Sequence, residues 1–503
     1  MNLTIKTPPP GYILNGVINA LPGDKSIAHR ALILSSIATG TSRLKNFPDS
    51  NDCRATLLCL KNLGVKIICP KKSELIIKGC GLNGLKPPAG ILNARNSGTT
   101  IRLLSGLLAG QPFASRITGG HSLKKRPMDR VILPLKKMGA TINGAGNDKF
   151  PPLFIRGGNL KSIQYRLPVP SAQVKSAILL AALYARGVTR IMEPAPSRNH
   201  TERMLKIMGA PLKISRRLWR TSPLAGGVIT LNNTKQWTLN PLNVTIPGDS
   251  SSAAFFIAAV LLVPNSKITI QNVCLNPYRI AFIQILRRMG GRIKIINRSR
   301  QSGEATERND SGPMDSEPRC LSGLRRVPAQ SGKSRPPPKA RLPPLARFAP
   351  KGDAPMGGKW GEETGHIIVR SSALKAVKIS GAIIPALIDE IPILAVLASQ
   401  ATGTTLIKNA EELRFKESDR LKTITAELKR LGANIRETVD GLIIKGPSRL
   451  KGAECSSHHD HRIAMSLAVA GLAAEGKTVI KNAGCIKDSF PEFEKMLKSL
   501  IHR

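Results

Sequence analysis

The sequence contains few aromatic residues and no long apolar run. Only 4% of its 503 residues are Phe, Trp or Tyr, so its cores must consist mainly of Leu, Ile, Val and Ala, which favours an α/β protein of at least two domains. No uncharged apolar stretch reaches the roughly 18 residues of a membrane span, and residues 1–21 resemble neither a signal peptide nor a transit peptide. We therefore expect a cytoplasmic protein with no membrane partner.

The sequence also lacks paired cysteines and a recognisable zinc motif. Its eight cysteines form no CxxC pair, and a chain of this length does not need disulfides for stability. Residues 458–461 include three histidines and an aspartate, but histidines so close together at a helix start do not converge on one metal ion. We expect free thiols and no metal site.

Acidic residues are scarce compared with basic ones. The chain has 76 Lys and Arg against 32 Asp and Glu, a formal net charge of +44. Nucleic acid, an anionic surface or small anionic substrates could account for a basic balance. However, the basic residues are spread along the whole chain, and there is no RNA-binding aromatic motif, zinc finger or basic tail. We therefore expect no specific nucleic-acid partner, while weak nonspecific adhesion stays open.

One short pattern occurs six times: a polar or Gly/Ser-rich opening followed by an Ala-, Leu- and Ile-rich helix that ends near a glycine. The openings begin at Asp24, Asn96, Ser171, Asp249, Asp389 and Asp460. A second landmark is a Leu-Gly or Met-Gly pair that predicts a helix C-cap before a strand such as 293–296. These pairs end at Gly64, Gly139, Gly209, Gly290 and Gly432. Six copies predict an architecture of six α/β units.

The spacing of both landmarks indicates one insertion. The openings are 72, 75, 78, 140 and 71 residues apart, and the C-caps are 75, 70, 81 and 142 residues apart. The excess falls on residues 298–359, which are rich in Pro, Arg, Ser and Gly and have almost no apolar periodicity. This composition predicts a disordered insert, and a passive insertion is favoured over a partner-binding segment. The insert has 13 Lys and Arg against 6 Asp and Glu, so the rest of the chain keeps +37.

Charged and small polar residues are concentrated at the repeat openings. A helix N-terminus presents unpaired N–H groups and a partial positive charge, which suit a phosphate or a carboxylate. The run 23–30 adds Lys25 and Arg30, and the run 411–420 adds Lys416 and Arg420 at i,i+4 spacing. Each run alone is also typical of a capped or solvated helix start. Six such N-termini together could converge on one anionic ligand.

Nine runs, in this order, resemble the motifs of 5-enolpyruvylshikimate-3-phosphate (EPSP) synthases. They are LPGDKSIAHRALILSSIATG, NSGTTIRLLSGLLAGQ, SLKKRPMDR, VPSAQVKSAILLAAL, IPGDSSSAAFF, IDEIPILAVLA, LRFKESDRL, HDHRIAMSLAVAGL and SFPEF. They extend over the whole chain except the insert. Nine ordered matches are far more specific than any one of them.

The resemblance implies a fold and an activity. The fold would be a two-domain, inside-out α/β barrel of six βαβαββ-like repeats, with the active site in the cleft between the domains. Residues 22–246 would form the upper domain, and residues 1–21 with 247–503 a discontinuous lower domain. The family transfers the enolpyruvyl group of phosphoenolpyruvate to the 5-hydroxyl of shikimate 3-phosphate and releases phosphate, in the shikimate pathway to aromatic amino acids. The resemblance further implies a monomer without a cofactor.

The resemblance also implies site residues by motif position. Lys25, Asp389 and Glu417 would be catalytic, and the two carboxyl groups would share proton transfer to the methylene carbon and from the 5-hydroxyl, without a division of roles. Phosphoenolpyruvate would be surrounded by Lys25, Arg126, Lys416, Arg420 and Arg462. Shikimate 3-phosphate would contact Lys25, Ser26, Arg30, Ser171, Gln173, Ser197 and Arg198. The remaining implied binding residues are Asn96, Gly98, Ala172 and Asp389.

Three positions depart from the family pattern. Arg95 stands where Gly is common before NSGTT, Ala172 replaces a frequent Ser, and Asp488 stands where many members have Lys. Lys487 could supply the missing cation from the neighbouring position. Glyphosate inhibits this family at the phosphoenolpyruvate site, and a tolerant subgroup has Ala at the position of Gly98. The glycine favours sensitivity, whereas VPSAQVKSA and HDHRIAMS resemble the tolerant subgroup.

Two other functions fit parts of the sequence. The related UDP-N-acetylglucosamine enolpyruvyl transferases would need their own opening motif and a loop cysteine, whereas this chain has GDKS followed by HR, and KRPM. The second alternative is an inactive basic scaffold that binds nucleic acid or membranes. It is disfavoured by the intact residues Lys25, Asp389, Glu417, Arg420 and Arg462.

Overall fold

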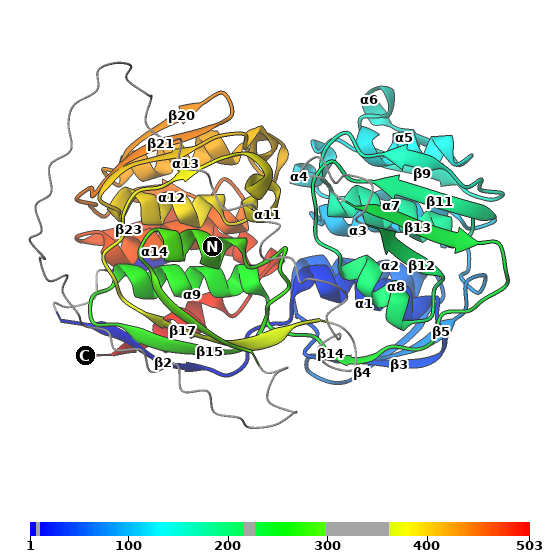
Figure 1. Ribbon diagram of the computed structural model, residues 1–503, viewed down its shortest axis with the longest axis horizontal. Helices are drawn as coiled ribbons and strands as arrows, with labels where there is room; N and C mark the ends of the chain where they lie inside the picture. Colours follow the sequence, from blue (N-terminus) through cyan, green and yellow to red (C-terminus); the bar gives the residue numbers. More distant parts are fainter. Residues whose placement is uncertain (7–10, 216–226, 298–361, 503) are drawn as a thin grey trace, which may run out of the picture.

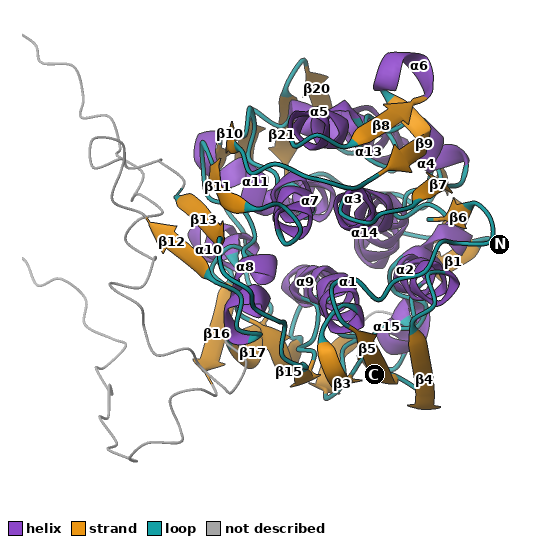
Figure 2. Ribbon diagram, turned by 90° about the vertical axis from the view of Figure 1, so that its right-hand side faces the viewer, coloured by secondary structure: helices purple, strands orange, loops and turns teal. Residues whose placement is uncertain are grey.

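Two lobes lie side by side, each with helices inside and strands outside (Figures 1 and 2). This computed structural model describes residues 1–6, 11–215, 227–297 and 362–502. The predicted insert, residues 298–359, lies outside the described residues. The arrangement confirms the predicted two-lobed α/β fold, but the described strands form six open sheets and no single closed barrel.

Six apolar helices, one from each repeat, form the centres of the lobes. They are α1 (Lys25–Ser36), α3 (Gly98–Ala109), α7 (Ala172–Ala182), α9 (Ser250–Leu262), α12 (Ile391–Gln400) and α14 (His461–Ala473). Most of their side chains are buried, because a helix that is apolar all round is stable only inside a core. Four predicted openings are N-caps, at Asp24, Ser171, Asp249 and Asp460. In the other two repeats the N-cap lies one residue later, at Ser97 and Glu390.

Five amphipathic helices lie between these central helices and the sheets. They are α2 (Asn51–Asn62), α5 (Asp129–Lys137), α8 (His200–Ile207), α10 (Ala281–Arg288) and α13 (Arg420–Arg430). Each is followed by the glycine that the sequence predicted as its C-cap, with φ between 87° and 99°. A Cβ disfavours this left-handed conformation, which explains the choice of glycine. The predicted strand 293–296 is confirmed as β16 (Arg292–Asn297).

The six sheets share one connection pattern, a parallel pair extended by antiparallel strands. The upper lobe has β14 (Asn243–Thr245), β3 (Thr39–Lys45), β5 (Glu74–Cys80), β4 (Lys66–Lys71); β6 (Leu92–Asn93), β7 (Ala114–Thr118), β9 (Phe150–Arg156), β8 (Thr141–Gly144); and β10 (Gln164–Arg166), β11 (Gly187–Met192), β13 (Val228–Asn233), β12 (Leu212–Ser215). The lower lobe has β16, β17 (Thr364–Arg370), β15 (Lys267–Cys274), β2 (Ile13–Ile18), β24 (Ile501–His502); β18 (Lys378–Ile379), β19 (Gly403–Ile407), β21 (Gly441–Gly446), β20 (Asn434–Thr438); and β1 (Leu3–Lys6), β23 (Lys477–Lys481), β22 (Glu454–Ser456).

The chain crosses between the lobes at two adjacent places. Strands β1 and β2 belong to the sheets of the lower lobe, and the chain then enters the upper lobe near Gly23. It returns near Gly248, which forms a bridge with Gly23. The buried apolar residues form two clusters, one from residues 3–21 and 253–500 and the other from 27–246 with Cys274. The two crossings thus lie where one apolar core gives way to the other.

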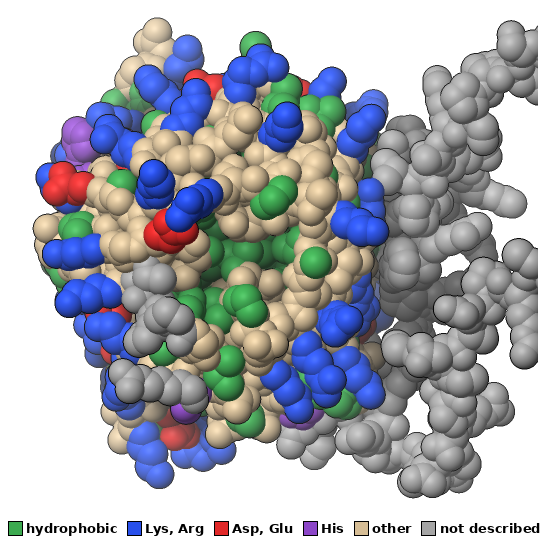
Figure 3. All heavy atoms as spheres, turned by 90° about the vertical axis from the view of Figure 1, so that its left-hand side faces the viewer, with side chains coloured by type: hydrophobic (Ala, Val, Ile, Leu, Met, Phe, Trp, Pro, Cys, Tyr) green, Lys and Arg blue, Asp and Glu red, His purple; other side chains and the backbone are tan. Residues whose placement is uncertain are grey.

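Short helices complete the structure. They are α4 (His121–Lys124), α6 (Ala145–Asp148), η4 (Gly381–Ile383), α11 (Ile384–Leu387), η5 (Glu411–Phe415), η6 (Ala483–Asp488) and α15 (Phe493–Lys498). No single helix in the described part of the chain is long and apolar enough to cross a membrane. Gly381–Leu387 and Ile391–Gln400 satisfy that test of length and composition only as a pair, bent by 108°. Figure 3 shows Lys and Arg side chains around the whole end face of the lower lobe and few acidic ones.

Removal of residues 300–359 is expected to leave folding and activity essentially unchanged. Asn297 on β16 pairs with Gly365 on β17, so the two ends of this segment lie opposite each other and a short loop can join them. The deletion must stop before Glu362, because its buried Oε1 lies 2.7 Å from Nδ1 of His200 in the upper lobe. Thermal melts and steady-state kinetics of the two forms would check this. An insoluble or inactive product would contradict the interpretation of 298–359 as an insert.

Candidate functional site

A cleft between the two lobes collects most of the residues that the sequence singled out. It contains a cavity of about 220 Å³. Ten cations line it: Lys25, Arg30, Arg102, Arg126, Arg130, Arg198, Arg279, Lys416, Arg420 and Arg462. Five carboxyl groups line it as well: Asp52, Asp249, Asp389, Glu412 and Glu417. This excess of positive charge in a partly enclosed space favours binding of small, highly charged anions.

Lys25 lies at the N-terminus of α1, where Asp24 caps the helix. Asp24 Oδ1 accepts a hydrogen bond from the Ile27 N–H, so the side chain of the next residue, Lys25, points into the cleft. Lys25 Nζ lies 2.9 Å from Asp52 Oδ2 on α2. Burial would lower the pKa of Lys25, but Asp52 outweighs it and raises that pKa. Lys25 therefore remains a charged ammonium group that can bind an anion.

Asp389 lies where the lobes meet, just before α12. Its Oδ2 contacts Arg198 of the upper lobe, and its Oδ1 lies 3.5 Å from Arg420 Nη1. Arg462 donates to the Asp389 carbonyl oxygen at 3.0 Å. Burial would raise the pKa of Asp389, but Arg462 and the other cations around it hold the pKa well below its usual range. Without a ligand, Asp389 is an ionised base surrounded by cations.

Glu417 bridges the two lobes through arginines. Its Oε1 lies 3.1 Å from Arg126 Nη1 of the upper lobe, and its Oε2 lies 2.5 Å from Arg420 Nη2. Arg420 is fully buried and also donates from Nε to Asp460 Oδ2 at 2.8 Å. Burial would raise the pKa of Glu417, but Arg126 and Arg420 hold it well below the usual range. Like Asp389, Glu417 is ionised in the ligand-free cleft.

Lys416 and His461 carry little competing charge into the site. Burial lowers the pKa of Lys416, although Asp389 partly offsets this effect, which makes its ammonium group a stronger acid than an exposed lysine. Burial, helped by Lys25, also lowers the pKa of His461 well below its usual value. His461 is therefore neutral at pH 7. In the part of the chain that the structure describes, no three His, Cys, Asp or Glu side chains form a group that could hold a metal ion.

The upper lobe contributes a fixed set of hydrogen-bonding groups. Arg30 is buried on α1; its Nε donates to Thr201 Oγ1 at 2.8 Å and its Nη2 to Ser176 Oγ at 3.0 Å. Ser171 caps α7 by accepting from the Val174 N–H. Gln173 Oε1 accepts from Arg102 Nη1 at 2.8 Å. These contacts keep the beginning of α7 facing the cleft.

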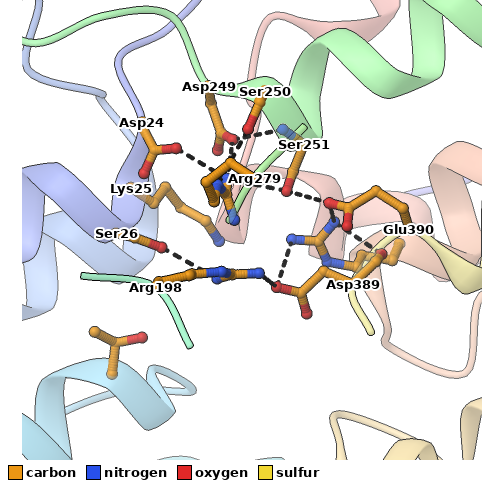
Figure 4. A network of polar contacts seen from close by, with 12 residues as sticks. Asp24, Lys25, Ser26, Arg198, Asp249, Ser250, Ser251, Arg279, Asp389 and Glu390 are labelled. Atoms are coloured by element: carbon orange, nitrogen blue, oxygen red, sulfur yellow. Dashed lines mark hydrogen bonds and ion pairs between the residues drawn. The ribbon is translucent and has the colours of Figure 1, made fainter. Parts of the chain in front are cut away.

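Arg279 joins the two lobes behind the cleft (Figure 4). Its Nη2 donates to Asp24 Oδ2 at 2.9 Å and to Asp249 Oδ1 at 2.8 Å, and these residues are the N-caps of α1 and α9. On the opposite side of this cluster, Arg198 contacts Ser26 and Asp389. One buried guanidinium thus fixes the helix N-termini on both sides of the crossing between lobes.

The three departures have different structural outcomes. Arg95 keeps the left-handed conformation expected of a glycine, with φ 50°, so the turn before α3 is retained at a cost of about 1 kcal/mol. Ala172 lines the cleft without a hydroxyl. Asp488 accepts from Asn51 Nδ2 at 2.9 Å, and Lys487 is exposed and does not line the cleft.

Fourteen of the fifteen candidate binding residues line the cavity, and so does Glu417; Asn96 does not. The Asn96 side chain lies instead beside the Asp488 carboxyl group. The sequence did not single out Asp52, Arg102, Arg130, Arg279 and Glu412 as site residues. Arg102 could have been found, because it lies four residues after Gly98 and therefore on the same face of α3. Asp52 and Arg279 lie outside the nine motifs, so no signal in the sequence pointed to them.

Comparisons with known proteins agree with this geometry. Residues 9–316 and 347–497 match the family model described as EPSP synthase (3-phosphoshikimate 1-carboxyvinyltransferase). The unmatched residues 317–346 fall inside the predicted insert. The 3-phosphoshikimate 1-carboxyvinyltransferase of Thermodesulfovibrio yellowstonii is 45% identical over 95% of this chain and 96% of its own length. That of Desulforamulus reducens is 42% identical over 96% of each chain.

Solved structures give the same result. An EPSP synthase from Acinetobacter baumannii superposes with a TM-score of 0.75 at 35% identity, covering 100% of both chains. The enolpyruvyl transferase NikO from Streptomyces tendae, at 16% identity and a TM-score of 0.68, shares the fold over 100% of this chain and 98% of its own. The chain belongs to the EPSP synthase family.

Proposed function

We propose that this protein is a 3-phosphoshikimate 1-carboxyvinyltransferase. It transfers the enolpyruvyl group of phosphoenolpyruvate to the 5-hydroxyl of shikimate 3-phosphate and releases phosphate. The observation that carries the proposal is the convergence of ten cations and two ionised carboxylates, Asp389 and Glu417, in one cleft between the lobes. Both substrates carry phosphate and carboxylate groups, so they can neutralise an excess of cations that no neutral substrate would.

The two ends of the cleft suit different substrates. Shikimate 3-phosphate binds against the upper lobe, where Ser26, Arg30, Ser171, Gln173 and Arg198 surround one region. Phosphoenolpyruvate binds between Lys25, Arg126, Lys416, Arg420 and Arg462, which come from both lobes and supply enough donors for a phosphate and a carboxylate. In the ligand-free structure Asp52 and Glu417 partly neutralise these cations. Binding therefore exchanges protein carboxylates for substrate anions.

The proton transfers are assigned from the charge states of the ligand-free site. Asp389 and Glu417 are ionised and can accept the proton of the 5-hydroxyl. The methylene carbon of phosphoenolpyruvate needs an acid, and a carboxyl group that has taken up a proton, or the buried Lys416 ammonium, can supply it. Phosphate then leaves the tetrahedral intermediate with its charge balanced by Lys25 and the surrounding arginines.

The same proposal includes the domain organisation. Residues 22–246 form one domain, and residues 1–21 with 247–503 form the other, with Arg279 and the Gly23–Gly248 bridge at the junction between them. A monomer is sufficient, because every group of the proposed site comes from one chain.

Incubation of the purified full chain with both substrates should release inorganic phosphate only when shikimate 3-phosphate is present. Mass spectrometry should then detect the enolpyruvyl ether product. Activity with UDP-N-acetylglucosamine in place of shikimate 3-phosphate would favour the related transferase instead. No phosphate release with either acceptor would favour the inactive scaffold.

Glyphosate is expected to inhibit the enzyme in competition with phosphoenolpyruvate, and Gly98→Ala is expected to weaken inhibition more than substrate use. A Cβ at Gly98 would lie 2.8 Å from Arg102 Nη1 and 3.2 Å from Arg126 Nη1. It would therefore displace the guanidinium groups at the phosphoenolpyruvate site. Inhibition constants of both forms at matched phosphoenolpyruvate would check this. A wild-type enzyme indifferent to glyphosate would show that Gly98 alone does not set the response.

A further inference from the structure

A buried cluster of one ammonium and two carboxyl groups lies directly behind the cleft. Lys175 on α7 is completely buried, and its Nζ lies 2.9 Å from Glu193 Oε2 and 2.6 Å from Glu202 Oε1. Glu193 follows β11, and Glu202 lies in the first turn of α8. The two glutamate side chains are 5% and 2% exposed, respectively. Water therefore cannot screen this cluster.

The cluster contains one more carboxyl group than it has cations. Burial would lower the pKa of Lys175, but Glu202 and Glu193 outweigh it, so the ammonium stays charged. Burial also raises the pKa of Glu193; Lys175 lowers that pKa and Glu202 raises it. Two ionised carboxylates would bury a net negative charge beside a site for phosphate. A single proton on one carboxyl group removes that cost.

The hydrogen bonds indicate which carboxyl group holds the proton. Glu193 Oε1 lies 2.5 Å from Ser197 Oγ, so a proton on this oxygen has an acceptor. Glu202 Oε2 is buried without a hydrogen-bond partner among the described residues, so a proton there would have none. Glu202 also makes the shorter contact with Lys175. The favoured state pairs ionised Glu202 with Lys175 and leaves Glu193 neutral.

We propose that Glu193 is a protonated carboxylic acid that donates to Ser197 Oγ and thereby directs the Ser197 hydroxyl hydrogen to the phosphate of shikimate 3-phosphate. This rests on the proposed function and on Ser197 as a substrate contact. A serine has a single hydroxyl hydrogen, and a phosphate dianion only accepts hydrogen bonds. If Ser197 donated to an ionised Glu193, it would have no hydrogen left for the substrate. Lys175, Glu193 and Ser197 thus form one chain of donors that ends at the phosphate.

Two substitutions at Glu193 separate this role from a purely structural one. Glu193→Gln keeps an acceptor for Lys175 and an N–H donor for Ser197, so the KM for shikimate 3-phosphate should stay within about twofold. Glu193→Met has a similar size but cannot donate, and it should raise that KM about tenfold, because a hydrogen bond to a charged group is weakened. In both variants kcat and the KM for phosphoenolpyruvate should change less than twofold. Lys175 keeps Glu202 as its partner, so both variants should fold.

Two further measurements test the mechanism. In a Ser197→Ala background, which should itself raise the KM for shikimate 3-phosphate, Glu193→Met should add no further loss. The infrared spectrum of the wild type should contain a C=O band of a protonated carboxylic acid that disappears in Glu193→Gln.

Equal KM increases in the Gln and Met variants, additive losses with Ser197→Ala, or the absence of the infrared band would overturn the proposal. Should Glu193→Met fail to fold, the Gln variant and the infrared band still decide. A wild-type enzyme without turnover would refute the proposed function instead, while the infrared band would report the protonation state of Glu193 independently.

Discussion

Replacement of Asp389 by Asn is expected to lower kcat by about 100-fold or more. Asn keeps the size of the side chain but cannot accept a proton. The affinity for shikimate 3-phosphate should remain within a few fold, because Arg198, released from its pair with Asp389, becomes available to the substrate phosphate. Steady-state kinetics and calorimetric titration with shikimate 3-phosphate would measure the two effects separately.

Asp440→Asn is a suitable control for this change. Asp440 lies in the same lobe and accepts from the Asn409 N–H at 2.8 Å, but it does not line the cleft. Its substitution should leave kcat unchanged. Near-normal turnover in Asp389→Asn would remove Asp389 from the proton transfers.

Replacement of Glu417 by Gln is expected to reduce kcat by a similar factor of about 100 or more. The change removes the only carboxylate within 4.0 Å of Arg126 among the described residues. It also takes one of the carboxylates from Arg420, which keeps Asp460. The loss should therefore affect both the proton transfer and the contact between lobes. Glu437→Gln is a matched control, because Glu437 pairs with Arg414 outside the cleft.

Stability gives Glu417 a second readout. Its folded-state pKa lies well below the ordinary value, so the ionised group stabilises the fold at pH values above the ordinary pKa of about 4.3. This contribution is lost as the pH falls through the folded-state pKa. The difference in melting temperature between wild type and Glu417→Gln should be constant near neutral pH and shrink in acid. A difference that grows in acid would contradict the ionised state, and normal turnover would exclude Glu417 from catalysis.

Much of the architecture could be predicted from local sequence. The six openings and five Met-Gly or Leu-Gly pairs predicted helices whose bounds the structure confirms, because capping residues and left-handed glycines act over a few neighbouring residues. The unequal spacing of the same landmarks located residues 298–359 without any structural information. The family resemblance added which side chains of those openings face a common cleft.

The charge partners were decided only by the tertiary structure. Asp52 beside Lys25, Arg279 between Asp24 and Asp249, and Arg126 against Glu417 each join segments from different repeats. Asn96 belongs to a predicted motif, yet its side chain turns to Asp488 instead of lining the cavity.

The buried cluster behind the cleft depends on packing in the same way. Nothing in the sequence around Lys175 or Glu193 distinguishes them from solvated surface residues, and only the packing of α7 and α8 against the loop after β11 excludes water. The sequence alone determined the repeat, its helices, their caps and the position of the insertion. Which charges meet, and which of them hold a proton, was decided by the tertiary structure, because both depend on distance and burial between segments far apart in the chain.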